Sequence, residues 1–191
     1  MNDPIDDQLA RSLLNRCAQQ DHDALTALHR LVARRIHAFV LPRLRDEDAA
    51  REVVSDTLHE AWKCAGKFRG DSLVSTWIFG IARNRMLAHW RQSSREHAYD
   101  DIDDHAETLP SGLDDGEQAL SRWQDRQIVN ACLGELSPAH RECMQLVYLE
   151  GMSLSEVAAV QQVPKGTVQS RLFHARNSMR LCVQRSTGDN E

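Results

Sequence analysis

The chain lacks the patterns by which membrane proteins and many enzymes are identified. It has no run of about 18 apolar residues, the length that a membrane span needs, and no CxxC, HExxH, P-loop or GxSxG motif. The first residues, Met1 to Pro4, are acidic and do not resemble a signal peptide. We therefore expect a cytosolic protein without membrane contact, metal, cofactor or catalytic residues.

Cysteine and histidine are present, but without the spacing of a metal site or a disulfide framework. The nine histidines are scattered, and none pairs with another ligand at zinc-ligand spacing. The cysteines are odd in number and lie mostly among helical apolar residues: Cys17, Cys64, Cys132, Cys143 and Cys182. We expect reduced thiols in the core, with a disulfide as the less favoured alternative.

The net charge of −5 is unevenly distributed. Residues 1–91 hold 14 Lys/Arg and 12 Asp/Glu, and residues 126–191 hold 7 and 6, so both ends are close to neutral. Residues 92–125 hold 2 Lys/Arg against 10 Asp/Glu, with few large apolar residues and several Pro and Gly. This composition predicts a flexible acidic linker over 92–125 between two helical domains, 1–91 and 126–191.

Two helices joined by a turn are predicted near the C-terminus. Ser153 can cap a helix whose Glu156 reaches back to the Ser153 backbone N–H, the reciprocal pair called a capping box. Pro164 cannot continue that helix, and Gly166 can adopt the angles that a turn needs. The pattern is typical of a helix-turn-helix, although paired amphipathic helices are also common in proteins that bind no DNA.

The helix after this turn has one apolar face and one polar face. The apolar face recurs at helical spacing and comprises Val168, Leu172, Ala175 and Met179. The opposite face carries side chains suited to base edges in a groove, namely Gln169, Ser170, Phe173, His174 and Asn177. Arg171 and Arg176 flank the apolar stripe, where a helix in a groove would meet phosphates.

The N-terminal domain shows helical spacing without alternation, so we expect no sheet. Apolar residues keep this spacing over 25–42, over 53–62 after an acidic start at 46–48, and over 74–82. A loop over 67–72 holds Phe68, and the helix after it carries Arg83, Asn84 and Arg85. Aromatic side chains between arginines suit the binding of unstacked bases in single-stranded DNA, although Trp77 also fits a core position.

In this order, the motifs resemble the extracytoplasmic-function group of bacterial RNA polymerase sigma factors over nearly the whole chain. Residues 24–91 resemble sigma region 2, in the segments 49–62, 67–70 and 77–84, and residues 136–180 resemble region 4. The resemblance implies an all-α protein in which a region 2 helical bundle and a region 4 helix-turn-helix are joined by the linker. It also implies a subunit that recruits core RNA polymerase, reads the minus-35 and minus-10 promoter elements, and melts DNA without ATP.

The resemblance assigns three surfaces. The surface for the clamp-helix coiled coil of the largest polymerase subunit would comprise Val53, Val54, Ser55, Asp56, Leu58, His59 and Trp62. The loop that captures a base flipped from the minus-10 element, with the helix after it, would comprise Phe68, Arg69, Gly70, Asp71, Ser72, Trp77, Asn84 and Arg85. The helix that docks in the minus-35 major groove would use Lys165, Gly166, Thr167, Gln169, Ser170, Arg171, Phe173, His174 and Arg176.

The sequence departs from the family pattern at four of these positions. Ser55 and Asp56 stand where Gln and Glu are usual, and Gln169 and His174 stand where arginines are frequent. The first departure leaves the polymerase contacts open, and the second leaves the promoter sequence open. The resemblance further implies an anti-sigma factor, a protein partner that covers these surfaces.

Two other classes of function are alternatives. An ordinary helix-turn-helix regulator would carry a sensory or interaction domain in its N-terminal half, whereas this half has the Phe68 loop and a helix with Arg and Asn. A helical enzyme would need a framework that holds the acidic residues of 100–117 as a site, and the sequence offers none. Co-elution with core polymerase tests the first alternative, and a divalent-metal binding assay on the linker tests the second.

Overall fold

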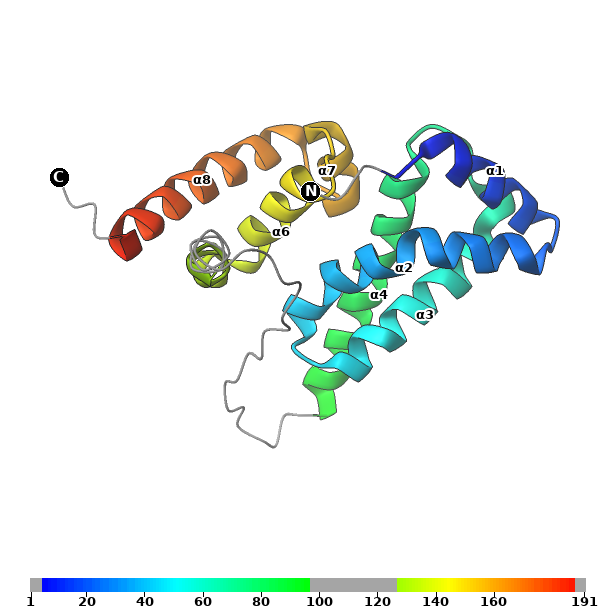
Figure 1. Cartoon of the computed structure of the whole chain (residues 1–191), viewed down its shortest axis with the longest axis horizontal. Coiled ribbons are helices and arrows are strands. Elements are labelled where there is room, and N and C mark those ends of the chain that lie inside the picture. The colour runs from blue at the N-terminus through cyan, green and yellow to red at the C-terminus, as the bar shows by residue number, and fades with distance from the viewer. Residues whose placement is uncertain (1–4, 97–126, 188–191) are drawn as a thin grey trace, which may run out of the picture.

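The computed structural model describes residues 5–96 and 127–187, which form helices and connecting turns without a β-strand (Figure 1). The first part contains α1 (Asp7–Ala18), α2 (His22–Leu44), α3 (Glu47–Cys64), a short 3-10 helix η1 (Ala65–Lys67) and α4 (Val74–Glu96). The second part contains a helix over residues 127–135, then α6 (Pro138–Tyr148), α7 (Leu154–Gln161) and α8 (Lys165–Thr187). The predicted all-α class is confirmed.

Aspartates start the first three helices. Asp6, Asp21 and Asp46 each accept hydrogen bonds from two backbone N–H groups in the first turns of α1, α2 and α3, at 2.9–3.2 Å. These caps satisfy amides that have no partner inside the helix. The helices bury a shared core, in which Phe39 of α2 and Phe79 of α4 meet edge to face with ring centroids 5.2 Å apart.

The second part is a helix-turn-helix preceded by two further helices. Ser153 and Glu156 form the predicted capping box at the start of α7, with Glu156 N donating to Ser153 Oγ at 3.3 Å and Ser153 N to Glu156 Oε2 at 2.8 Å. Ser137 caps α6, and Pro138 occupies its first turn, where the missing N–H leaves no helical bond unmade. The predicted apolar stripe of α8 faces the core, with only Met179 half-buried.

The turn between α7 and α8 differs from its prediction. The residue with left-handed backbone angles is Gln162 (φ 56°), which ends α7, whereas Gly166 lies in the first turn of α8 without a positive φ. Pro164 directly precedes α8 and is compatible with a helix start. Helix α2 also runs past Pro42 to Leu44, because a proline in the last turn removes a single helical donor.

The expectation of reduced thiols is wrong for one pair. Cys132 and Cys182 form a disulfide between the helix over 127–135 and α8, with their Cα atoms 5.7 Å apart. Cys17 and Cys143 are buried free thiols, and burial raises the pKa of each thiol above its ordinary value. Cys64 is free and half-buried. The disulfide therefore braces the second part of the chain covalently, and the first part has no such link within its described residues.

The two parts of the chain lie against each other, with α7 beside the N-terminal half of α4 (Figure 1). Helix α4 continues to Glu96, and the rest of the predicted acidic linker falls outside the described residues. The predicted domain boundaries therefore stay predictions. Among the described helices, none combines the length and apolar composition that a membrane crossing requires.

Candidate nucleic-acid and polymerase interface

The outer face of α8 carries the side chains predicted to read DNA. Gln169, Ser170, Phe173, His174 and Arg176 are all exposed, with Phe173 62% exposed. Of the remaining predicted residues, those in the first turn of the helix are exposed or half-buried, namely Lys165, Gly166 and Thr167. This face is therefore accessible to a partner such as a DNA groove.

The two arginines of α8 that were predicted to meet phosphates have different surroundings. Arg171 is half-buried and donates to Gln161 Oε1 at 2.8 Å, so it ties α8 to the end of α7. Arg176 is exposed and donates to the Tyr148 hydroxyl at 2.6 Å, with its guanidinium 5.6 Å from the Tyr148 ring centre. Arg176 is therefore the better placed of the two to reach a phosphate.

A histidine pair extends the exposed face of α8 onto α6. The rings of His140 and His174 stack with centroids 6.2 Å apart. Partial burial, followed by the nearby charges of His174 and Arg171, lowers the pKa of His140 below its usual value. In the absence of DNA, this favours the neutral imidazole at position 140.

The predicted base-capturing loop lies between η1 and α4. Phe68 is half-buried against Trp77, with ring centroids 5.3 Å apart, while Arg69, Gly70 and Asp71 are exposed. Gly70 has a φ of +82°, an angle that favours glycine. The structure thus brings the loop and the first turn of α4 together, as the sequence predicts.

The polar face of α4 continues from this loop. Asn84 is exposed, and Arg85 is half-buried in an ion pair with Glu60 of α3. The hydrogen bond from the Cys64 thiol is the largest cause that lowers the pKa of Glu60; the burial cost opposes it, and the hydrogen bond and charge of Arg85 lower this pKa further. Arg85 therefore links α4 to α3 in this structure, whereas Asn84 is exposed on the outer side of the helix.

Only part of the predicted polymerase surface is accessible. Val53, Val54 and Leu58 point into the core and are at most 7% exposed. The exposed members of the set are Ser55, Asp56 and His59. Trp62 is half-buried and stacks on His22 with ring centroids 5.1 Å apart. The buried members shape α3, and the exposed members can touch a partner.

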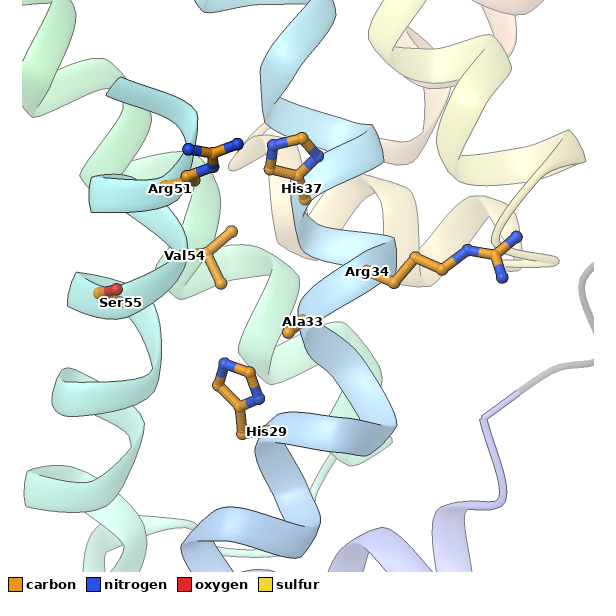
Figure 2. A pocket seen from close by; sticks show the side chains of 7 residues that line it. All are labelled: His29, Ala33, Arg34, His37, Arg51, Val54 and Ser55. Carbon is orange, nitrogen blue, oxygen red and sulfur yellow. The ribbon is translucent and has the colours of Figure 1, made fainter. Parts of the chain in front are cut away.

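A hollow beside this surface contains residues that the sequence analysis does not single out. It has a volume of about 320 Å³ and lies between α2 and α3, as Figure 2 shows, and it is lined by His29, Ala33, Arg34, His37, Arg51, Val54 and Ser55. Four of these side chains are basic or can become so. The signal available in the sequence is the i, i+4, i+8 spacing of residues 29, 33 and 37 on one helix face. The described residues contain no cluster of ligands suited to a metal ion.

Two ion pairs join the first part of the chain to the second. Arg35 of α2 binds Glu150 with Nη2 and Oε2 2.6 Å apart, and both side chains are less than a tenth exposed. Arg83 of α4 binds Glu142 of α6 with Nε and Oε1 2.8 Å apart. Both carboxylates come from the helix-turn-helix part, and both arginines come from the first part.

Two weaker polar contacts lie nearer the helix-turn-helix. The Thr76 hydroxyl donates to Glu156 Oε1 at 3.0 Å, and Gln162 Nε2 donates to Asn84 Oδ1 at 3.5 Å. The first contact joins the start of α4 to the capping box of α7. The second places the turn of the helix-turn-helix directly on the exposed residue of α4 that is predicted to face the minus-10 element.

Burial at the contact between the two parts disfavours the charged forms of its side chains. Desolvation raises the pKa of Glu150 against the opposing attraction of Arg35. Desolvation also lowers the pKa of Arg43 to about 10, against the attraction of Glu142 and helped by Arg141 and Arg83. Because ion pairs lose hydration when they are buried, such pairs fix an orientation more than they add stability.

Family models match both parts of the chain. The model described as Sigma-70 region 2 matches residues 26–96, and the model described as Sigma-70, region 4 matches residues 126–179. Together they contain the loop, α4, the exposed face of α3 and the DNA-facing side of α8.

Curated proteins and solved structures give the same picture over nearly the whole chain. The chain is 30% identical to the ECF RNA polymerase sigma-E factor of Escherichia coli (strain K12), covering 96% of this chain and 97% of that protein. It is 27% identical to the RNA polymerase sigma-H factor of Pseudomonas aeruginosa, covering 91% and 93%. It is similar in structure to the sigma factor RpoE of Bartonella quintana, solved with the anti-sigma factor NepR, at 25% identity and a TM-score of 0.68 over 83% of this chain and 96% of that one.

Proposed function

The chain belongs to the extracytoplasmic-function group of sigma-70 factors, and we propose that it starts transcription through three separate surfaces. These are the Phe68 loop with Asn84, the outer face of α8, and the exposed face of α3. Each surface is made by helices that the core holds rigid. The single observation that carries the assignment is the match of both sigma regions, in order, to the two parts of the structure that expose these side chains.

The Phe68 loop with Asn84 captures a base from the minus-10 element. Extruding a base from a duplex costs about a few kcal/mol, least where pairing is weak. A protein that binds only the extruded base lowers the free energy of the open duplex and leaves the closed duplex unchanged. Melting in this way needs neither ATP nor a catalytic residue, so we assign no enzyme activity to the chain.

The outer face of α8 reads the minus-35 element. Gln169, Ser170 and His174 can exchange hydrogen bonds with base edges, and a good bidentate pair discriminates by about 1–3 kcal/mol. Arg176 reaches outward beside them and fits a phosphate, which contributes affinity without sequence preference. Arg171 acts mainly within the protein, because Gln161 already accepts from its guanidinium.

The exposed face of α3 and the hollow beside it bind polymerase. Ser55, Asp56 and His59 present polar groups to a helical partner, and the hollow offers Arg34 and Arg51 next to them. A partner helix with acidic side chains complements this basic hollow. Since polymerase and the chromosome share the bacterial cytosol, the chain acts there.

The described arrangement cannot read both promoter elements at once. Asn84 lies 3.5 Å from Gln162, and Lys165 is at most about 11 Å further along the chain. The two elements are named for positions about 25 base pairs apart, which is roughly 85 Å along the duplex. The two parts must therefore separate before the promoter is fully bound, and the ion pairs of Arg35 and Arg83 must break.

A protein partner that covers these surfaces keeps the chain inactive. The structural relative from Bartonella quintana was solved with an anti-sigma factor, and the two matched regions of this chain offer the same kind of target. An interface of about 1,600 Å² is ordinary for a specific complex and is large enough to cover surfaces on both parts. Co-expression with such a partner yields a heterodimer that does not bind core polymerase.

The alternative of an ordinary helix-turn-helix regulator is not favoured. Its N-terminal half would be a sensory or interaction domain, whereas residues 26–96 of this chain match sigma region 2. Dimerisation on DNA in the absence of polymerase is the behaviour that this alternative requires.

Reconstituted transcription tests the proposed function. The purified chain is mixed with core polymerase and a promoter library in which every minus-35 position varies. Gln169→Ala should change the ranking of the promoters, whereas Arg176→Ala should lower all of them by a similar factor. If both variants lower transcription from all promoters by the same factor, the roles on α8 are assigned wrongly. No promoter-dependent transcription with the unaltered chain would overturn the function itself.

A further inference from the structure

The base-capturing loop has little support of its own. Residues 69–71 are exposed, and the angle at Gly70 is one that most residues avoid. The loop ends at Leu73, whose carbonyl accepts from Trp77 N and so starts α4. Leucine has no side-chain acceptor, so it cannot cap the first turn of that helix. The order of this loop must come from elsewhere in the molecule.

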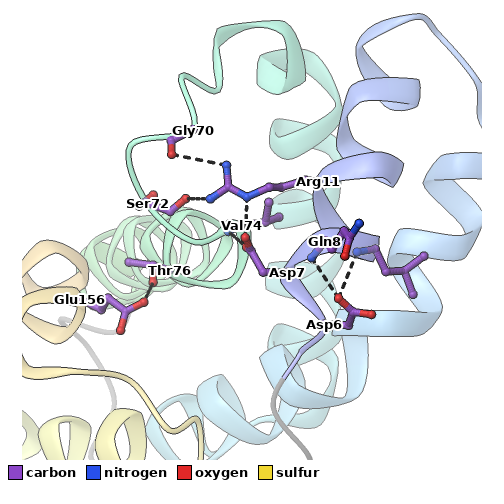
Figure 3. Close-up of polar contacts among 10 residues, drawn as sticks. Asp6, Asp7, Gln8, Arg11, Gly70, Ser72, Val74, Thr76 and Glu156 are labelled. Carbon is purple, nitrogen blue, oxygen red and sulfur yellow. Dashed lines mark hydrogen bonds and ion pairs between the residues drawn. The ribbon is translucent and has the colours of Figure 1, made fainter.

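Arg11 of α1 supplies contacts to the loop backbone. Its guanidinium donates from Nη2 to the Ser72 carbonyl at 2.7 Å and from Nη1 to the Gly70 carbonyl at 3.4 Å, as Figure 3 shows. The same group lies 5.5 Å from the centre of the Phe68 ring. One side chain therefore touches three positions of the loop, and it does so from a segment more than fifty residues earlier in the chain.

Asp7 completes this support. One carboxylate oxygen accepts from Arg11 Nε, and the other accepts from Val74 N at 2.7 Å (Figure 3). Val74 is the first residue of α4, so Asp7 caps that helix from α1 in place of Leu73. Asp7 and Arg11 stand at i and i+4 on α1, an arrangement that helical spacing favours.

The contact also accounts for glycine at position 70. A Cβ built on Gly70 would lie 3.1 Å from Arg11 Nη1, closer than most such contacts allow. The guanidinium is a planar group that can donate to two carbonyls at once, whereas a lysine ammonium is a single point charge. The geometry therefore fits arginine at position 11 and glycine at position 70 together.

We infer that Asp7 and Arg11 are positioning residues for base capture, which hold the Phe68 loop in its binding shape before DNA arrives. This rests on the proposed role of the loop. A loop that is already ordered loses less conformational entropy on binding, and that gain appears as affinity for the unpaired base. Neither residue needs to touch DNA to have this effect.

Binding of single-stranded DNA tests the inference. The full chain is assembled with core polymerase, and its affinity is measured by fluorescence anisotropy for non-template-strand minus-10 oligonucleotides that carry each of the four bases at each position. Arg11→Ala should weaken binding about tenfold and flatten the preference at the captured base. Arg11→Lys should recover part of the affinity. Core polymerase affinity should stay within about twofold of the unaltered chain for both variants, since neither α3 nor the hollow is changed.

Two further variants separate the possible outcomes. Arg16→Ala is the matched control, because Arg16 lies on the same helix and pairs with Asp21 away from the loop, and it should leave base preference unchanged. Phe68→Ala tests the role of the loop itself. If Phe68→Ala leaves base preference intact, the proposed role of the loop fails. If Phe68→Ala abolishes preference and Arg11→Ala keeps it, the positioning role fails. Equal loss of DNA and polymerase binding with both Arg11 variants would assign Arg11 to folding and overturn the inference.

Discussion

The two DNA-facing parts of the molecule are in different states in the same structure. On the helix-turn-helix, Gln169, Phe173 and Arg176 face solvent and are ready to meet a groove. On the first part, Asn84 is in contact with Gln162, and the neighbouring Arg83 is held by Glu142. One predicted reading surface is free of contacts with the other part, whereas the other has one of its residues, Asn84, in contact with the helix-turn-helix.

The difference between the two surfaces bears on how the chain folds and on how its two parts move apart. Each part has its own helix caps, and the buried apolar side chains of both parts form one continuous cluster. The contact between the parts combines apolar packing with buried ion pairs, and burial disfavours the charged forms of Glu150 and Arg43. The molecule is therefore expected to be folded before it meets polymerase and to change mainly in how its two parts are placed.

The largest expected effect concerns the covalent brace, which only the helix-turn-helix part has among the described residues. Replacing both Cys132 and Cys182 by alanine should lower the stability of α6, α7 and α8 by about 2–4 kcal/mol, because the disulfide closes a loop with a sequence separation of 50. Hydrogen exchange should show faster exchange over 138–187 and little change over 7–96. Cys17→Ala, at a buried free thiol of the first part, is the control and should act on the first part only. Unchanged protection in the double variant would contradict this expectation.

The next prediction distinguishes capture of the minus-10 base from recruitment of polymerase to the promoter. Phe68→Ala should reduce open-complex formation about 10–100-fold on duplex promoters, because the side chain binds only the extruded base. A template with a mismatched, already melted minus-10 segment should restore transcription, as it should for Asn84→Ala. Phe173→Ala is the matched aromatic change on the other part and should not be rescued by that template. Failure of the melted template to rescue Phe68→Ala would point to lost folding or lost polymerase binding.

A smaller effect is expected from opening the contact between the parts. Glu142→Lys places a cation against Arg83 and the half-buried Arg43, so the two parts should separate in the free chain. The affinity for a promoter with both elements, relative to one with a single element, should rise about fivefold, because a larger fraction of molecules can span the promoter.

The control variant for Glu142→Lys makes the same change of charge at a site away from the contact between the two parts. Glu135→Lys alters the net charge equally, but Glu135 pairs with Arg185 at an exposed site within the second part. It should leave the relative affinity unchanged. A reversed pair, Arg83→Glu with Glu142→Lys, should restore the closed arrangement. If Glu142→Lys and Glu135→Lys raise the relative affinity equally, the effect comes from charge alone.

The smallest expected effect is on the dependence of minus-35 binding on pH. The pKa of His140 is lowered in the free chain, first by burial and then by His174 and Arg171, so the neutral form prevails near neutral pH. DNA phosphate favours the protonated ring and raises that pKa, so binding takes up a proton and strengthens as pH falls. Holoenzyme affinity for a minus-35 duplex should rise about twofold between pH 8 and pH 6. His140→Ala should weaken this dependence, and binding that tightens toward high pH would contradict it.

Local features of this chain could be predicted well from its sequence. The capping box of Ser153 and Glu156 and the start of α3 after Asp46 depend on a few neighbouring residues, and both are present. The apolar stripe of α8 follows from periodicity alone and is buried as expected. Gly166 was expected in the turn, whereas it lies in the first turn of α8 and Gln162 adopts left-handed angles at the end of α7.

Features that depend on distant residues could not be predicted. Helix α1 offers only a short apolar face, and it is stabilised by packing on the rest of the first part. The pairing of Cys132 with Cys182 and of Arg35 with Glu150 joins residues far apart in the chain, and each residue alone fits a core thiol or a solvated charge. The same holds for Arg11, whose contacts with the Phe68 loop become visible only once α1 is placed.

The distance between the two parts, measured before and after promoter binding, tests the central claim most directly. Spin labels can be attached through non-natural amino acids at Ser12 of α1 and Ser155 of α7, which are both exposed, so that the free thiol of Cys64 does not interfere. We expect one short distance in the free chain and an increase of tens of ångströms in the complex with core polymerase and promoter, since the two elements lie roughly 85 Å apart. The same distance in both states would contradict the account.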